Sequence, residues 1–299
     1  MTPMTTDTRG GSRRGRRLAA WLHTRPRLQL ALLLALPLGF FFLAYIGSLF
    51  ILFLNAFWES DPFSGRVIPS FTLDSFVTLF TIEVYRTIAF RTIGMAILVT
   101  LTCVALGFPI AYYMARIAAP RTRRLLVVAV LMPLWASYLV KIYTWRTILA
   151  GNGFADWLLS PLGIEGPGLD SLVSAWLVLT YLWLPYMILP IFAAIERIPS
   201  SLLEASSDLG GRSGPTFRRV ILPLVLPGIA AGSIFTFSLT LGDYIVPDLV
   251  SDTQFIGNVI YSNSSLGSLP LAAAYSLVPM VVMVAYLLVA RRLGAFESL

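Results

Sequence analysis

Acidic and aromatic residues gather near the ends of two apolar stretches of the sequence. Asp243, Tyr244 and Asp248 follow a stretch that ends at Gly242, while Tyr143 and Trp145 lie towards the end of another. Carboxylates and aromatic rings can hold an ammonium group by ion pairing and by cation–π contacts of about 0.5–2 kcal/mol each. These five residues could therefore line a path for a cation. Equally, aromatic residues at such places often form an interfacial belt in membrane proteins, with Asp243 among the lipid headgroups.

A second group of residues lies in the segment 199–223. Glu204 and Asp208 are four residues apart, so they share one side of a short helix, and Gly210 or Gly211 can end that helix. A helix of about two turns is marginal in water, so we expect it to pack against something else. Its predicted apolar face consists of Leu202, Ala205, Ser206 and Leu209.

The same segment continues with a second helical start. Pro215 suits the first turn of a helix, and Phe217 follows it in an otherwise polar and basic stretch. An aromatic side chain there is expected to be buried against a partner or against its own chain.

Several kinds of chemistry are absent from the sequence. Its one histidine is His23, its one cysteine is Cys103, and its one lysine, Lys141, does not follow a glycine-rich loop. A histidine or thiolate metal site and a Walker A phosphate loop are therefore excluded, and no Gly-x-Ser-x-Gly elbow occurs. We predict no catalytic residue and no metal site, and expect a transporter, a channel component or a scaffold.

The elements that position these residues are predicted to be membrane-spanning helices. Of the 299 residues, 57% are hydrophobic and only 12% are charged, against roughly 25% charged in soluble domains. Five stretches without charge each exceed the ~20 residues that a spanning helix needs. They are Leu28–Trp58, Thr92–Ala115, Ser171–Ile195, Val220–Gly242 and Thr253–Ala290, the last with its apolar part at Leu271–Ala290.

A sixth span is expected where Leu125–Val140, interrupted by Lys141, extends through Leu149 to spanning length. We therefore predict an all-α integral membrane protein with six transmembrane helices. The continuous apolar runs do not show the ~10-residue alternation of a membrane β-barrel.

The distribution of charge predicts the orientation. Most of the 22 basic residues fall in the N-terminal tail, after the second and fourth spans, and at the C-terminus. The positive-inside rule then places both termini of this multi-pass protein in the cytoplasm. We expect a basic tail at 1–27, a six-helix domain at 28–293 and a short tail at 294–299. The excess charge then faces anionic lipid headgroups, so no nucleic-acid partner is expected.

The segment 199–223 resembles the EAA loop of importer-type ABC permeases. That pattern is Glu-Ala-Ala, three residues, Gly, nine residues, Ile, one residue and Leu-Pro. Glu204-Ala205 match, Gly210 is in register and Leu222-Pro223 match, while Ser206 replaces an alanine and Val220 the isoleucine. The resemblance implies the type I importer permease fold and a loop that docks on an ATPase subunit. The implied coupling residues are Glu204, Ala205, Asp208, Gly210, Phe217 and Pro223.

Further segments resemble permease subunits of spermidine/putrescine importers, which implies a polyamine as solute. These segments are Pro133–Trp145, Gly151–Gly153, Leu184–Pro190, Pro227–Gly232 and Gly242–Pro247. Similar permeases import opines, thiamine, iron or amino-acid-like solutes, so another small polar solute is the alternative. An ion-coupled secondary transporter is a further alternative; it predicts inverted repeats and intramembrane acids, which we do not find.

The resemblance also implies partners. Two copies of a cytoplasmic ATP-binding subunit would carry ATP and magnesium, so this chain needs no cofactor of its own. A second permease chain, related but different, would complete the pathway, and an extracytoplasmic binding protein would deliver the solute. The resemblance further implies the bacterial inner membrane as the location, and transport would proceed by alternating access within its lipid bilayer.

Overall fold

A computed structural model describes residues 26–61, 66–208 and 211–292 of the chain. It divides into two compact units, residues 1–54 and 55–299, which are described separately. Of the predicted tails at 1–27 and 294–299, residues 1–25 and 294–299 lie outside the described residues. The first unit is a run of helix whose apolar part, Leu33–Asn55, is long enough to cross a membrane. Its segments are α2 (Pro26–Phe40), the π-helical η1 (Phe41–Ile46) and α3 (Gly47–Asn55).

The second unit is also helical, apart from one short hairpin in which Glu59 pairs with Ile68. Its elements up to the middle of the chain are β1 (Glu59–Ser60), β2 (Val67–Ile68), α4 (Asp74–Thr81), α5 (Glu83–Tyr112), η2 (Tyr113–Ile117), α6 (Pro120–Trp135), α7 (Tyr138–Leu149), α8 (Phe154–Leu159) and η3 (Ser160–Leu162). The later elements are α9 (Leu172–Glu196), α10 (Ser200–Asp208), α11 (Ser213–Thr216), η4 (Phe217–Ile221), α12 (Leu222–Gly242), α13 (Ile245–Val250), α14 (Ile256–Ser265) and α15 (Leu269–Arg292).

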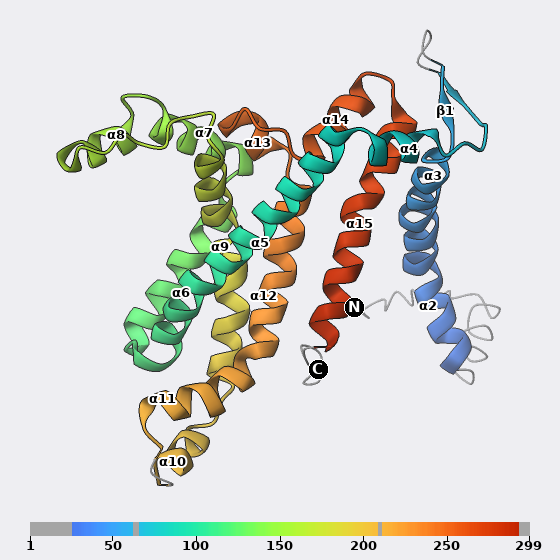
Figure 1. The fold of residues 1–299 in the computed structure, drawn as a ribbon. Helices are drawn as coiled ribbons and strands as arrows, with labels where there is room; N and C mark the ends of the chain where they lie inside the picture. The colour runs from blue at the N-terminus through green and yellow to red at the C-terminus, as the bar shows by residue number, and fades with distance from the viewer. Residues whose placement is uncertain (1–25, 62–65, 209–210, 293–299) are drawn as a thin grey trace, which may run out of the picture. The chain divides into compact units, whose positions relative to one another are not determined.

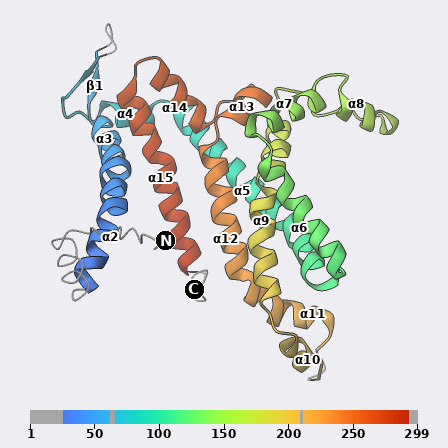
Figure 2. The ribbon, with the colours of Figure 1, turned by 180° about the vertical axis from the view of Figure 1, so that it is seen from behind.

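Three long helices, α5, α9 and α12, pack side by side at the centre of the second unit (Figures 1 and 2). Their contact is close because α12 presents small residues to α9. A Cβ atom on Gly228 would lie 2.6 Å from Cβ of Ala194, and one on Gly232 would lie 2.7 Å from Sδ of Met187. The Gly-x-x-x-Gly pair of α12 therefore serves helix packing, as such pairs do in membrane proteins.

Two smaller apolar clusters extend this core. Ala96 of α5 packs with Phe237 and Leu241 of α12, and the ring of Phe237 stacks on Tyr286 of α15 at 4.5 Å. A separate cluster joins α4, α14 and α15 around the buried Tyr275. These contacts connect α15 to α5 and α12 on one side and to α4 and α14 on the other.

The expected straight span through Leu125–Leu149 is broken in the structure. The two helices α6 and α7 meet at an angle of 97° across Ala136 and Ser137, both of which have extended backbones. A straight continuation would place Lys141 and Arg146 within the apolar layer, which is costly for charged groups. The bend instead carries α7 alongside α13, at one end of the unit (Figure 1).

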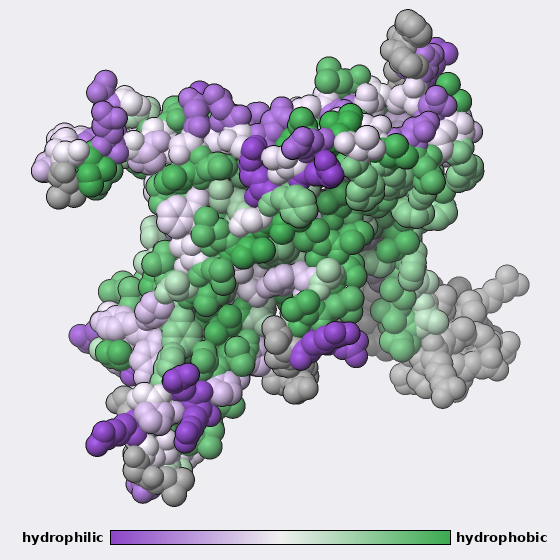
Figure 3. Space-filling model, in the orientation of Figure 1, coloured by the Kyte–Doolittle hydropathy of each residue, from purple (hydrophilic) through white to green (hydrophobic). Residues whose placement is uncertain are grey.

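Five helices of the described chain are long and apolar enough to cross a membrane, and the bent pair α6–α7 gives a sixth when it is counted as one span. The predicted all-α class is confirmed, and five of the six predicted spans are single helices. Over the second unit, Figure 3 shows a broad hydrophobic band between hydrophilic patches at the α10–α11 end and at the α13–α14 end. The hydrophilic patches therefore lie at the two ends of the unit, which are called here the α10 end and the α13 end.

Candidate functional site

The helix α10 carries three of the predicted coupling residues on its surface. Glu204, Ala205 and Asp208 are all exposed, and α10 projects beyond the ends of α9 and α12 (Figure 1). In the chain it follows the long helix α9, and the short α11 and η4 lead from it into α12, so it is a short helix between two long apolar ones. Such a helix presents carboxylates where another protein can reach them.

The prediction of which residues form the apolar face of α10 is wrong in part. Leu202 is 44% exposed and Ala205 is exposed as well, whereas Leu203 packs against the main core. Ser206 is half-buried and its hydroxyl lies 2.8 Å from the Thr216 hydroxyl. The helix is thus rotated by about one residue from the expected register, because it rests on α11 and η4 instead of packing along its full apolar stripe.

A glycine ends α10, as expected. The backbone N–H of Gly211 donates to the carbonyl of Ser206 at 2.8 Å, and a Cβ atom on Gly211 would lie 2.5 Å from that oxygen. A side chain there would open the turn that closes the helix. The other predicted residues of this turn, Leu209 and Gly210, lie outside the described residues.

The second half of the segment is anchored by Phe217. Its ring meets that of Phe108 in α5 edge to face, with centroids 5.4 Å apart. Phe217 is therefore covered by its own chain, which is one of the two outcomes that the sequence allowed. Pro223, the last of the predicted coupling residues, lies exposed in the first turn of α12.

At the α13 end, Asp243 is buried and fully engaged. Only 7% of the residue is exposed, one carboxylate oxygen accepts the Tyr138 hydroxyl, and the other accepts the backbone N–H groups of Ile245 and Val246 at 3.0 and 3.1 Å. Burial raises the pKa of the Asp243 carboxyl, although these three hydrogen bonds act in the opposite direction. The carboxylate starts α13 and ties it to α7.

The remaining predicted pathway residues lie close by in the fold but apart from that carboxylate. Tyr244 is 37% exposed and stacks on Tyr261 at 4.9 Å, and Asp248 is exposed on α13. Those on α7 are Tyr143, which is 53% exposed, and Trp145, whose ring lies 5.4 Å from that of Tyr181. The helices α7 and α13 are neighbours, so four of the five residues present rings or carboxylates at the same end of the unit.

Sequence reasoning missed Tyr138, the residue that joins α7 to Asp243. Its ring also stacks on Trp183 of α9 at 5.9 Å, and Trp183 meets Tyr186 at 5.9 Å. The signal was present in the sequence, since Tyr138 lies within the segment that resembles polyamine permeases. Its partner could not be identified, because 105 residues separate Tyr138 from Asp243.

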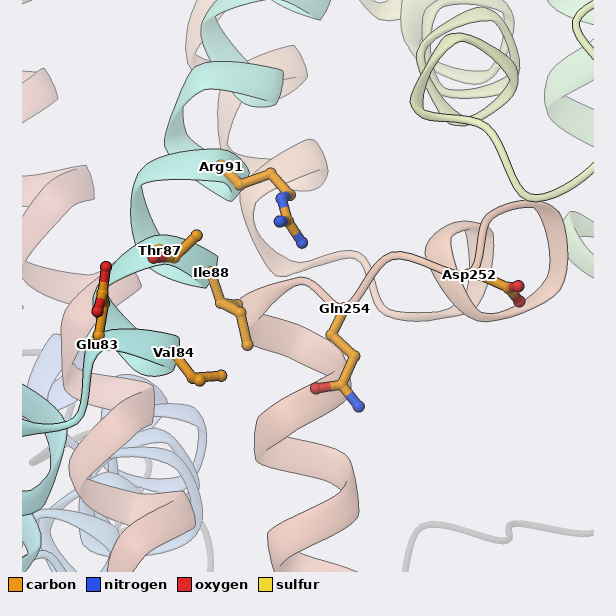
Figure 4. A pocket seen from close by; sticks show the side chains of 7 residues that line it. All are labelled: Glu83, Val84, Thr87, Ile88, Arg91, Asp252 and Gln254. Atoms are coloured by element: carbon orange, nitrogen blue, oxygen red, sulfur yellow. The ribbon is translucent and has the colours of Figure 1, made fainter.

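A polar cleft of about 440 Å³ lies at the start of α5, near the segment that leads into α14. In Figure 4 the Arg91 side chain extends from α5 towards the segment of Gln254, whose own side chain runs away from Arg91, and Glu83 and Asp252 lie on opposite sides of the view. None of these residues was predicted as a site residue. Within residues 26–61, 66–208 and 211–292, no three His, Cys, Asp or Glu residues gather as a metal site.

Comparison with known proteins assigns the family. The family described as the binding-protein-dependent transport system inner membrane component matches residues 104–295. The chain belongs to this family. The matched range begins in α5 and extends past the end of α15, so it includes α10 and both groups of site residues.

Individual relatives agree with the family. The inner membrane ABC transporter permease protein YdcU of Escherichia coli (strain K12) is 47% identical over 290 residues, which cover 92% of each chain. The spermidine/putrescine transport system permease protein PotB of the same organism is 33% identical, over 73% of this chain and 81% of PotB. A crystal structure of the bacterial alginate ABC transporter has a TM-score of 0.70 at 20% identity, over 92% of this chain and 96% of that chain, and shows the fold alone.

Proposed function

We propose that this permease subunit forms half of the translocation pathway of an ATP-driven importer and that α10 is its coupling helix. The observation that carries the proposal is the exposure of Glu204, Ala205 and Asp208 on a short helix that projects between two spans. ATP-driven closure of the partner subunits would pull on α10, and the spans would switch from inward-open to outward-open. The residues Gly210, Phe217 and Pro223 belong to the same coupling segment.

The proposed topology follows from the charge distribution. The α10 end faces the cytoplasm together with both termini, and the α13 end faces outward, in a multi-pass protein of the inner membrane. The proposed partners are two ATP-binding subunits that carry ATP and magnesium, a second and related permease chain, and an extracytoplasmic binding protein. A relative in fold has been crystallised with a periplasmic protein, which supports the last of these.

The proposed solute is a polyamine, spermidine or putrescine. The similarity to PotB supports this choice, as does the group of rings and carboxylates at the α13 end. Tyr143, Trp145, Tyr244 and Asp248 are proposed to contact the cation on its way into the pathway. Asp243 would contribute by holding α7 and α13 together, because both of its carboxylate oxygens already accept hydrogen bonds.

The experiment that tests this function is ATP hydrolysis by the assembled complex in nanodiscs. The complex is given its binding protein with spermidine, putrescine or a neutral sugar, and stimulation above the basal rate is measured. Stimulation by a polyamine alone is the expected result. Stimulation by the sugar alone would retain the permease and exclude the polyamine, and no stimulation by any solute or by the binding protein would contradict the importer itself.

A further inference from the structure

The connector between α9 and α10 is held by an arginine from a distant part of the chain. The connector comprises only residues 197–199, and Arg116 of η2 reaches it. The Nη2 atom of Arg116 donates to the carbonyl of Ile195 at 2.8 Å and to that of Ile198 at 2.6 Å. The last carbonyls of a helix have no partners within it, and a cation is favoured there. The Ile195 carbonyl also accepts the backbone N–H of Ile198 at 3.2 Å, so Arg116 adds a charged donor to the turn where α9 passes into α10.

A second arginine strengthens the same attachment. Arg123 of α6 forms an ion pair with Glu196, the last residue of α9, and its guanidinium lies 5.1 Å from the ring centre of Phe192. The side chains of this ion pair are 32% and 49% exposed, so the pair contributes little by itself. The half-buried Arg116, with two hydrogen bonds from a charged donor, is the stronger of the two attachments.

The other end of the coupling segment returns to the same stretch of chain. Phe217 packs on Phe108, and Phe108 stacks in turn on Tyr112, the residue before η2, at 6.4 Å. The Arg116 attachment and the Phe217 contact each start from a π-helical turn, since η2 (Tyr113–Ile117) carries Arg116 and η4 (Phe217–Ile221) carries Phe217. Such turns are rare and occur frequently at functional sites. Residues 108–123 thus hold the coupling segment at its beginning and at its end.

We propose that Arg116, assisted by Arg123, is a positioning residue that makes the end of α5, η2 and the start of α6 move together with α10. The proposal rests on the proposed docking of α10 on an ATPase subunit. Without this attachment, the motion of α10 would reach the spans through the backbone on either side of it and through the packing of Leu203 and Phe217. Arg116 makes no contact with solute or nucleotide in this assignment, and it acts through the helix ends that it joins.

Distance measurement between spin labels tests the proposal without a solute. Cys103, the one cysteine, is replaced by serine, and labels are placed at the exposed positions Ser201 in α10 and Leu125 in α6. The complete complex is compared in nanodiscs without nucleotide and with ATP plus vanadate. We expect the same distance in both states for the otherwise native chain, and a nucleotide-dependent shift once Arg116→Met is introduced. A shift already present before that substitution, or none after it, would overturn the proposal.

Hydrolysis by the same variants provides the second measurement. Losing one hydrogen bond from a charged donor changes an equilibrium by about tenfold or more, and Arg116→Met removes two, so it should lower the ratio of stimulated to basal hydrolysis at least tenfold. Arg116→Lys should recover part of it because a lysine can still donate to either carbonyl. Arg121→Gln is the matched control: Arg121 is exposed in the first turn of α6 and forms no ion pair among the described residues, so the ratio should stay unchanged. An equal loss in this control would overturn the proposal.

A charge exchange keeps the proposal falsifiable if Arg116→Met fails to reach the membrane. Arg123→Glu alone should lower the same ratio, and Arg123→Glu combined with Glu196→Arg should restore it. Absence of rescue, with both proteins assembled, would count against the attachment.

Glu204→Lys distinguishes the docking role of α10 from the positioning role of Arg116 and Arg123. If stimulation survives this substitution, the docking role of α10 fails; if Glu204→Lys abolishes stimulation while the Arg116 and Arg123 variants retain it, only the positioning role fails.

Discussion

The two polar ends of this permease use the same acidic chemistry in opposite ways. At the α10 end, Glu204 and Asp208 are exposed and turned away from the core. At the α13 end, Asp243 is buried, and three donors from α7 and α13 surround it. A buried carboxylate whose oxygens are all engaged stabilises the fold, whereas an exposed one on a projecting helix is available to a partner. The comparison separates an exposed carboxylate, which is proposed to bind another protein, from a buried one that joins two helices of its own chain.

The largest effect is expected from reversing a charge at the α10 end. Glu204→Lys should reduce solute-stimulated hydrolysis by at least tenfold, because a buried contact to a partner is replaced by an unpaired charge of the opposite sign. The amount of permease in the membrane should not change, since Glu204 is exposed. The measurement is stimulated hydrolysis in nanodiscs together with the level of assembled complex.

Glu165→Lys is the control for that experiment. Glu165 is equally exposed but lies between η3 and α9, away from α10, so stimulation should remain normal. If both reversals lowered stimulation equally, the effect would come from the total charge of the protein instead of from the coupling helix.

A change at the α13 end should act on stability first. Asp243→Ala leaves the Tyr138 hydroxyl and the N–H groups of Ile245 and Val246 without their acceptor, which should cost about 2–4 kcal/mol of stability. Tyr138→Phe removes a single hydrogen bond to the carboxylate and should cost about 1–2 kcal/mol. Unfolding of the purified protein in detergent, followed by fluorescence, measures both.

The exposed Asp248 provides the control for these substitutions. Asp248→Ala should change stability by less than about 0.5 kcal/mol, as expected for a surface position. If Asp243→Ala unfolded no more easily than Asp248→Ala but transported less solute, Asp243 would contact the cation directly, as the sequence alone suggested.

The difference between the two ends also explains what the sequence could predict. Uncharged stretches determine the spans, and local spacing determines α10 and its glycine terminus, so these features could be predicted. The prediction of which side of α10 is buried was wrong because Leu203 packs on a core built from other helices, which no local pattern reveals. The bend between α6 and α7 was missed for a similar reason, since it brings α7 beside α13, which follows it by about a hundred residues.

The same distinction between local patterns and distant partners applies to the site residues. The sequence identified Asp243 by its type and its place after an apolar stretch, but its partner Tyr138 is distant in the chain. In the same way, Arg116 and Arg123 look like ordinary basic residues of a loop after a span, and only the fold shows that they reach the end of α9. Local patterns predict a short exposed helix such as α10, whereas side chains that join distant helices need the structure.

The smallest effect is expected from an exposed ring at the α13 end. Tyr143 is 53% exposed on α7, so it contributes at most a cation–π contact to a passing polyamine. Tyr143→Ala should therefore lower uptake of labelled spermidine into proteoliposomes by about two- to fivefold, the effect of about 0.5–1 kcal/mol. Tyr143→Phe should retain most of the uptake, because it preserves the face of the ring and removes only the hydroxyl. Equal loss in both variants would assign the effect to the hydroxyl, and no loss in either would leave Tyr143 as a residue of the membrane interface, so that the exposed carboxylate of Asp248 would be the next contact to test.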